Sequence, residues 1–235
     1  MTTDFNRYKE DYKEQVDKSI RFSGQTVEFF TEIKAQLIVQ LSKILQIDSQ
    51  RLIVLDLGCG QGLTDMFLVN EFHMLHGVDI AHSAVEKARM LNPSVVYKVY
   101  DGFKLPYEEN TFDIVFTICV MHHLKVTERK NFISEMKRVT KEQGLIIIFE
   151  HNPINCFTRH AVSQCEFDRD AILISKTELK NILFEDGLSI CKESYILFFP
   201  LRGKLFRFIE RGLKRLPIGA QYYLVADKNH LHGRY

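Results

Sequence analysis

Short apolar runs alternate with amphipathic segments through the middle of the chain. The first run, Leu52 to Leu55, is rich in branched residues and is followed at once by an acidic residue and a glycine turn. Such runs are typical of strands covered on both faces. The pattern predicts strands at 51–57, 74–79, 95–100, 112–118 and 144–150, and helices at 62–71, 82–91 and 127–139. Strands alternating with helices predict an α/β fold, a doubly wound and mostly parallel sheet with helices on both faces.

The segments around this core have other patterns. Residues 26–45 carry apolar side chains every three or four positions, which predicts an amphipathic helix packed on the sheet. Residues 1–22 are polar and aromatic and predict a short helix or arm, which is either solvated or a lid over a ligand. Residues 151–170 predict a long irregular stretch, and such stretches in compact domains are usually functional or disordered. The last elements predicted are a helix at 175–186 and strands near 191–199 and 220–227.

A basic segment lies between these last two strands. Residues 201–217 contain six basic side chains and one acid, Glu210, and their apolar residues fall at helical spacing. This pattern predicts a basic amphipathic helix. It either packs on the domain edge or contacts an anionic membrane or a lipid-linked acceptor.

The glycine turn after the first strand suggests the kind of ligand. Three glycines alternate in Gly58-Cys59-Gly60-Gln61-Gly62, and Asp56 precedes them. A dinucleotide site has the spacing G-x-G-x-x-G and seats a pyrophosphate on a helix N-terminus. An acid beside a G-x-G-x-G turn disfavours a pyrophosphate and favours a cationic amino group, such as that of S-adenosylmethionine. Asp79 follows about 20 residues later, where a carboxylate can accept both ribose hydroxyls.

Four segments in this order resemble the motifs of class I S-adenosylmethionine-dependent methyltransferases, in particular a small-molecule branch of type 11 and a bacterial subgroup within it. They are Leu55 to Gly62, Gly77 to Ile80, Tyr100 to Phe103 with Leu105 to Tyr107, and Phe112 to Thr117 through to Leu124. The resemblance covers about residues 50 to 150. It implies a Rossmann-like methyltransferase domain with a seven-stranded sheet, whose last strand is antiparallel.

The resemblance also implies one domain over residues 1–235. Residues 1–48 would form an N-terminal helical cap or lid, and 50–150 the cofactor-binding core. Residues 151–235 would supply the acceptor-side loop and the last strands, with 201–217 inserted.

The implied cofactor is S-adenosyl-L-methionine, and the resemblance places its site at ten residues. Asp56 would help to hold the methionine ammonium, Asp79 the ribose and Asp101 the adenine amino group. The set is Asp56, Gly58, Cys59, Gly60, Asp79, Ile80, Asp101, Gly102, Phe103 and Ile118. Cys59 is expected to be a close-packed filler within the turn, and Ile118 to offer its carbonyl to the methionine end.

Catalytic groups are expected where the fourth and fifth strands end. The cofactor supplies the activated methyl group, so a general base is needed only for a weakly nucleophilic acceptor. His122 and His123 follow the fourth strand, and Glu150 and His151 end the fifth. Each could bind or deprotonate an acceptor; the alternative is that the histidines only shape the pocket.

No metal is expected from the local spacing. His151, Cys156, His160 and Cys165 lack the tight C-x₂-C pair of many zinc sites. Thr117-Ile118-Cys119 lacks the acidic cluster of the magnesium-dependent catechol methyltransferases.

The expected reaction is methyl transfer to a small or medium-sized acceptor, such as an oxygen of a sugar, a lipid-linked or a natural-product intermediate. The stretches from Glu150 to Asp168 and from Gly219 to Tyr223 resemble the bacterial subgroup that suggests these acceptors. The net charge is only +1, so the chain has no strong overall positive potential that would attract nucleic acid, and no nucleic acid partner is expected. The alternatives are an RNA methyltransferase and a non-catalytic cofactor-binding partner.

The expected location is cytoplasmic. The five cysteines are scattered and odd in number, and neither a signal peptide nor a membrane-length apolar run is found.

Overall fold

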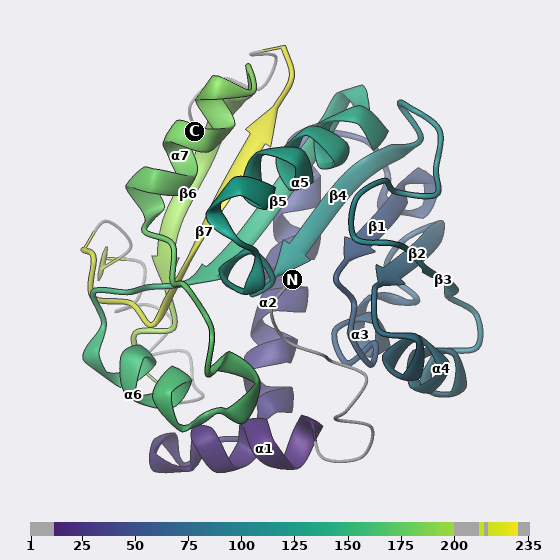
Figure 1. Ribbon diagram of the computed structural model, residues 1–235. Helices are drawn as coiled ribbons and strands as arrows, with labels where there is room; N and C mark the ends of the chain where they lie inside the picture. The colour runs from purple at the N-terminus through teal and green to yellow at the C-terminus, as the bar shows by residue number, and fades with distance from the viewer. Residues whose placement is uncertain (1–11, 200–211, 214–215, 230–235) are drawn as a thin grey trace.

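The computed structural model describes residues 12–199, 212–213 and 216–229 (Figure 1). The first helices are α1 (Tyr12–Ser19) and α2 (Val27–Ser42). The strands and helices that follow are β1 (Ile53–Leu57), α3 (Asp65–Leu68), β2 (Met74–Asp79), α4 (His82–Leu91), β3 (Val96–Val99), β4 (Phe112–Ile118), α5 (Val126–Val139), β5 (Thr140–His151), α6 (Cys156–Gln164), α7 (Lys176–Glu185), β6 (Ser189–Ile196) and β7 (Gln221–Asp227). Short 3₁₀ turns connect some of them, including Met121–His123 and Glu166–Asp168.

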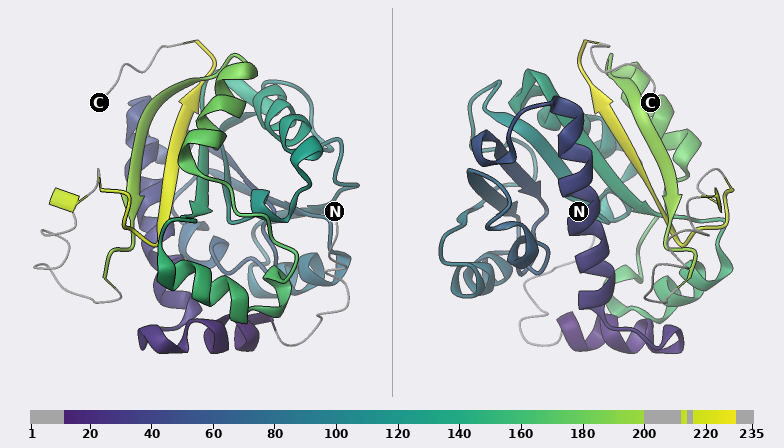
Figure 2. Two further views of the ribbon diagram at one scale, coloured as in Figure 1. Left: turned by 60° about the vertical axis from the view of Figure 1, so that its left-hand side comes forward. Right: turned by 180° about the vertical axis from the view of Figure 1, so that it is seen from behind.

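One seven-stranded sheet forms the centre of the molecule. Its order is β3-β2-β1-β4-β5-β7-β6, and β7 is antiparallel to both of its neighbours while the other pairs are parallel. Helices cover both faces, as the view of Figure 1 and the view from behind in Figure 2 show. The predicted fold class is therefore confirmed, including the antiparallel last strand.

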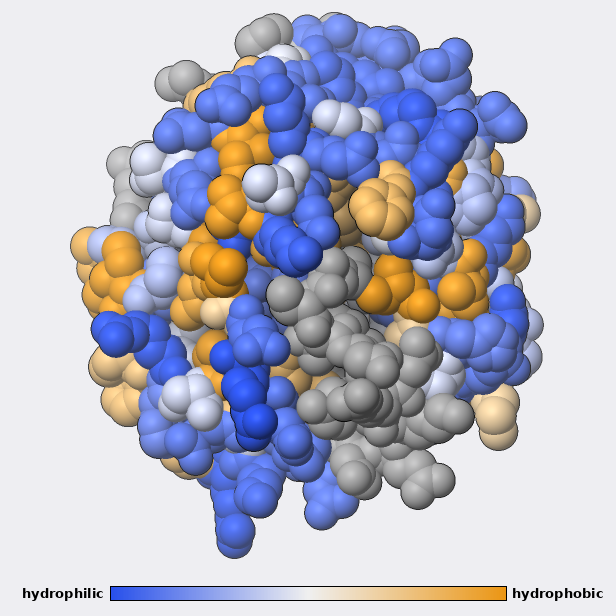
Figure 3. Space-filling model, in the orientation of Figure 1, coloured by the Kyte–Doolittle hydropathy of each residue, from blue (hydrophilic) through white to orange (hydrophobic). Residues whose placement is uncertain are grey.

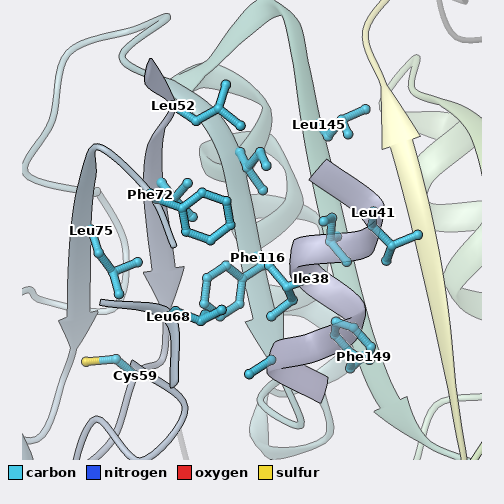
Figure 4. Close-up of a cluster of buried hydrophobic side chains, with 14 of the residues drawn as sticks. Ile38, Leu41, Leu52, Cys59, Leu68, Phe72, Leu75, Phe116, Leu145 and Phe149 are labelled. Carbon is cyan, nitrogen blue, oxygen red and sulfur yellow. The ribbon is translucent and has the colours of Figure 1, made fainter. Parts of the chain in front are cut away.

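Alternate residues of the central strands belong to two separate hydrophobic cores, one on each face of the sheet. Along β5, Leu145, Ile147 and Phe149 point to the face covered by α2, α3 and α4. Figure 4 shows this cluster, in which Ile38 of α2 lies beside Phe116. The residues between them, Ile146 and Ile148, belong to the core under α5 and α7. A strand covered on both faces must be apolar at every position, which is why the pattern identified β5 so clearly.

The parallel strands end at one edge of the sheet, and α1 and α6 lie beneath that edge (Figure 1). The α1 helix contacts both α6 and α2. The Asp17 carboxylate accepts a hydrogen bond of 2.7 Å from the Val27 backbone N–H, which fixes α1 to the first turn of α2. The part of the predicted N-terminal arm that the structure describes is therefore helical and anchored. Whether it closes as a lid stays a prediction.

Two predicted segments differ from the structure. The helix predicted at 62–71 is only Asp65–Leu68, because Gly62 has a left-handed φ of 72° that a helix cannot contain. The stretch predicted to be irregular at 151–170 contains α6, which begins at Asn155, whose side chain accepts from the Thr158 N–H. The Thr158 hydroxyl donates to Ala220 O, and Thr158 is the one buried residue of α6, so the sequence offered few fully buried apolar positions from which to predict this helix.

Three further findings concern the basic segment, the search for membrane-spanning helices and the surface of the molecule. The predicted basic helix at 201–217 lies outside the described residues, apart from 212–213 and 216–217. Within the described ranges no helix combines the length and apolar character needed to cross a membrane. Hydrophilic residues dominate the face in Figure 3, with hydrophobic residues in separate small patches.

Candidate active site

A cavity of about 740 Å³ opens at the edge where the parallel strands end. Its walls come from the glycine turn, the ends of β2 and β4, and helices α1, α2 and α6. Small-molecule sites commonly measure roughly 300–1,000 Å³, so this cavity can hold a cofactor together with a modest acceptor.

The glycine turn is tied to the second strand by backbone hydrogen bonds. Gly58 N and Cys59 N donate to Val78 O at 2.8 and 3.0 Å. Gly58 has a φ of 82°, and a Cβ at this position would collide with the Val120 side chain. The turn therefore packs directly on the segment after β4, and only glycine fits there.

Asp79 organises the loop beside this turn. One carboxylate oxygen accepts from Gly60 N at 2.9 Å and the other from Ala81 N at 2.8 Å. Each oxygen retains a lone pair, so the carboxylate can still accept hydroxyl groups of a ribose from the cavity. The position agrees with the ribose role expected of Asp79, which stays a prediction.

Two acidic residues share the space behind the turn. Asp56 is 3% exposed and Asp65 is fully buried, and one oxygen of each carboxylate has no donor. Burial and the Asp65 charge raise the pKa of Asp56 well above its usual range, and burial raises the pKa of Asp65 to about 6. A proton shared between the two carboxylates accounts for both unsatisfied oxygens. The Tyr97 hydroxyl donates to the other Asp65 oxygen at 2.6 Å.

Seven of the ten predicted cofactor residues line the cavity, and three do not. The lining residues are Asp56, Gly58, Cys59, Gly60, Asp79, Ile80 and Ile118. Asp101, Gly102 and Phe103 lie outside the wall. The Asp101 carboxylate accepts from the Phe103 and Lys104 N–H groups at 2.8 and 2.9 Å, and Phe103 is 68% exposed. Tyr100 lines the cavity at this place instead.

A group of five side chains, four of which line the same cavity, is named here the imidazole–carboxylate cluster: His122, His123, Glu150, His151 and Asp168. His122 Nδ1 lies 2.8 Å from Glu150 Oε2, and His122 Nε2 lies 3.3 Å from Asp168 Oδ1. His123 Nε2 is 3.4 Å from the same Asp168 oxygen. His151 packs against His122 with ring centroids 5.0 Å apart. The four predicted catalytic residues therefore come together, and Asp168 joins them.

Protonation differs sharply within this cluster. Burial by itself lowers the pKa of His122, but the Glu150 and Asp168 carboxylates outweigh it and raise that pKa to about 9. Burial and the His122 charge lower the pKa of His123 to about 3 and of His151 to about 4. Near neutral pH the cluster without ligand thus holds one imidazolium between two carboxylates and two neutral imidazoles.

Backbone contacts hold the two segments of the cluster in register. Ile172 N donates to His122 O at 2.8 Å, which ties the chain after Asp168 to the turn that carries His122. The buried Arg129 guanidinium donates to Ile172 O at 2.5 Å and pairs with Glu178 at 2.8 Å. The histidine turn and the Asp168 turn therefore form one rigid unit.

Among the further polar residues that line the cavity, Asp168, Lys34 and Gln221 were not predicted as site residues. Asp168 ends a stretch that resembles the bacterial subgroup, but only the fold brings it to the histidines. Lys34 of α2 is 8% exposed, and its positive charge lowers the pKa of Asp56. Lys34 could have been recognised from the sequence, because it is a lysine on the apolar side of the amphipathic helix α2. Gln221 opens β7, and its amide nitrogen lies 3.3 Å from His151 Nδ1.

The four residues considered for zinc do not form a site. Among the described residues, one group of three or more metal-binding side chains comes together, and it consists of His122, His123 and Asp168.

Comparisons with known proteins agree with this architecture. The model of a methyltransferase domain family matches residues 55–148. An uncharacterised methyltransferase of Synechocystis sp. is 30% identical over 60% of this chain and 68% of its own length. A crystal structure of an S-adenosylmethionine-dependent methyltransferase, possible histamine N-methyltransferase, from Thermotoga maritima superposes with a TM-score of 0.67. It is 19% identical and covers 96% of this chain and 98% of its own, which shows a common fold.

Other relatives differ in what they act on. A probable tRNA methyltransferase 9B of Mus musculus is 31% identical over 53% of this chain, and norajmaline N-methyltransferase of Rauvolfia serpentina is 33% identical over 42%. The chain spans 27% and 35% of the lengths of these two proteins.

Proposed function

The chain belongs to the S-adenosylmethionine-dependent methyltransferases, and we propose that it methylates a hydroxyl oxygen of a small acceptor. One observation carries the proposal. The glycine turn and the imidazole–carboxylate cluster line one and the same cavity, so cofactor and acceptor can meet in one enclosed space.

The cofactor would extend along the ends of the parallel strands. Asp79 would accept the ribose hydroxyls, Ile80 would pack on the adenine, and Ile118 would offer its carbonyl to the methionine ammonium. Lys34 would pair with the methionine carboxylate, because it places a buried ammonium on this part of the wall. A proton shared by Asp56 and Asp65 would leave one negative charge, and not two, behind the glycine turn.

Methyl transfer would then proceed by a single displacement. The acceptor oxygen attacks the methyl carbon, the carbon–sulfur bond breaks, and its electron pair returns to sulfur to leave neutral S-adenosylhomocysteine. The hydroxyl proton becomes strongly acidic as the oxygen–carbon bond forms, so it passes to the imidazole of His151 and then to solvent. His151 suits this role by position, since it lines the cavity at the end of β5.

A small acceptor fits the enclosure better than a large one. The helices α1 and α6 lie over the edge where the strands end, and residues of both line the cavity. Hydroxyls of sugars, lipid-linked or natural-product intermediates remain the acceptors that we propose. A transfer RNA is the second candidate, because the similar proteins include a probable tRNA methyltransferase, contrary to the expectation of no nucleic acid.

The test is transfer of a radiolabelled methyl group to three acceptor pools: small hydroxyl compounds, small amines and total tRNA. We expect label in the hydroxyl pool, and loss of at least about tenfold of the turnover in His151→Ala with cofactor affinity kept. Asp79→Ala should lose S-adenosylhomocysteine binding in calorimetry. Label only in tRNA or amines would refute the hydroxyl proposal, and binding without turnover on every pool would indicate a non-catalytic partner.

A further inference from the structure

We propose that His122, His123 and Asp168 form a binding site for a divalent first-row transition-metal ion at the acceptor end of the cavity. The site does not depend on the identity of the acceptor, and it goes beyond methyl transfer itself.

The ligand atoms already have the spacing of a metal site. Asp168 Oδ1 lies 3.3 Å from His122 Nε2 and 3.4 Å from His123 Nε2, and the three ligand atoms all lie within 4.8 Å of one another. Two ligands with bonds of about 2.1 Å to one ion are separated by roughly 3.0–3.4 Å in octahedral or tetrahedral geometry. Two of the three pairs of ligand atoms therefore already have the separation that binding to one ion requires.

The surroundings of His122 are those of a metal-bound histidine. Its second nitrogen, Nδ1, lies 2.8 Å from Glu150 Oε2, and Glu150 Oε1 accepts from Met121 N at 2.7 Å. Histidines that bind metals usually donate this second ring N–H to a carboxylate, which fixes the tautomer and directs Nε2 at the ion. Glu150 is fully buried, and its contacts with His122 Nδ1 and Met121 N offset the desolvation of its carboxylate.

The site is held in place and is still accessible. His122 and His123 stand on one 3₁₀ turn and Asp168 on another, and the Ile172 N–His122 O hydrogen bond joins the two turns. His122 is 1% exposed, whereas His123 and Asp168 are each 14% exposed and line the cavity. Three protein ligands leave a position open toward the cavity, as in catalytic zinc sites.

The donor set indicates the class of ion. Two imidazoles and one carboxylate suit zinc, iron(II), cobalt(II) or manganese(II), whereas magnesium and calcium prefer oxygen ligands alone. Local spacing predicts no metal here, because the carboxylate lies far along the chain from the two histidines. An ion at this place would polarise an acceptor hydroxyl and lower its pKa; this role, unlike the site, rests on the proposed function.

The test measures metal binding and needs no acceptor. Chelator-treated protein is titrated with Zn²⁺ by calorimetry and with Co²⁺ by visible absorption, which reports the ligand field of the bound ion. We expect one equivalent to bind to wild type, and the affinity to fall at least about 100-fold in His123→Ala and in Asp168→Ala. Glu150→Gln should weaken binding about 10–100-fold through His122. His160→Ala is the matched control, because it removes an exposed imidazole outside the cluster and should bind as wild type does.

S-adenosylhomocysteine titration of each variant shows that the fold and the cofactor site persist, with affinities within about threefold of wild type. Absence of saturable binding to wild type, or equal affinity in wild type and His123→Ala, overturns the proposal. Metal binding without methylation of any hydroxyl compound would refute the proposed function and leave the metal site standing.

Discussion

The two parts of the cavity wall that we propose for the cofactor and the acceptor, called here the cofactor end and the acceptor end, are built in different ways. The cofactor end is built mainly on one short stretch, Asp56 to Gly62, with the Asp79 carboxylate at the end of the next strand. Its geometry comes from backbone N–H groups and positive φ angles. The acceptor end collects side chains from three separated segments, and its geometry comes from contacts among His122, Glu150 and Asp168. Most of the first end depends on backbone geometry, with Asp79 as its main side chain, whereas the second depends on side chains that can be altered one at a time.

This difference separates the binding of the cofactor from the choice of the acceptor. A site built from backbone groups, such as the glycine turn, suits a ligand that is the same in every family member, and many chains can share it. A side-chain cluster can be re-formed without disturbing the sheet, so relatives with different acceptors can use one cofactor site. Changes at the two ends should therefore have separable effects.

The largest effect is expected at the cofactor end, from Gly58→Ala. The added methyl group meets Val120, and alanine must adopt a φ of 82°. We expect S-adenosylhomocysteine affinity to fall about 100-fold or more, corresponding to about 3 kcal/mol of strain and displacement. Calorimetric titration measures the loss.

Gly24→Ala is the control for this change. It imposes a φ of 70° with no atom within 4 Å of the new Cβ, so it should cost only about 1 kcal/mol of folding stability. Similar losses of cofactor affinity in Gly58→Ala and Gly24→Ala would show that backbone strain, and not the contact with Val120, causes the loss.

The next effect is expected from Arg129→Met, which affects the acceptor end alone. Methionine fills much of the space but leaves Ile172 O without its donor, so we expect a loss of about 1–3 kcal/mol of folding stability. Methyl transfer should fall severalfold while S-adenosylhomocysteine affinity stays within about twofold. Urea unfolding and calorimetry measure the two quantities.

Arg89→Met offers the comparison. Arg89 also donates to a backbone carbonyl, Tyr97 O, but it is 46% exposed, so its loss should cost less than about 1 kcal/mol. If Arg129→Met weakened cofactor binding as strongly as turnover, the two ends would not be independent.

A pH dependence should follow from the Asp56–Asp65 pair. Both carboxyls have a folded-state pKa above the unfolded value, so the unfolded chain releases its protons first as pH rises. The free energy of unfolding of wild type should therefore fall between about pH 4 and pH 6.

Asp65→Asn should flatten this part of the profile, because the amide can donate to Asp56 and still accept from Tyr97. The difference between wild type and variant should reach roughly 1–3 kcal/mol at pH 7 relative to pH 4. Urea unfolding at a series of pH values measures it, and parallel profiles would rule out the shared proton.

The smallest effect is expected at the cavity mouth. Phe157 of α6 stacks on Phe22 with centroids 6.0 Å apart, and it is 63% exposed. Phe157→Ala should change folding stability by less than about 1 kcal/mol but raise the KM for the acceptor a few fold. The exposed Phe184 of α7 gives the control, since Phe184→Ala should leave that KM unchanged. An unchanged KM in Phe157→Ala would mean that α1 and α6 do not guide the acceptor.

Much of the architecture could be predicted from local pattern. The run Leu145 to Phe149 identified a strand buried on both faces, and the predicted helix at 82–91 coincides with α4. The glycine turn and its place after the first strand were predicted, whereas the helix start predicted at residue 62 was wrong, because Gly62 has a left-handed φ. The α6 helix was not predicted, because Thr158 is its one buried residue and contacts the backbone through its hydroxyl.

By itself, the sequence determined the fold class and the family and predicted where the cofactor binds, since these depend on period, turn chemistry and short spacings. Only the tertiary structure decided the acceptor end. It brought Asp168 to His122 and His123, made one imidazole a cation and two neutral, and turned the Asp101 carboxylate into its own loop. The physical reason is range: backbone conformation is set by neighbours in the chain, whereas charge and coordination are set by neighbours in space.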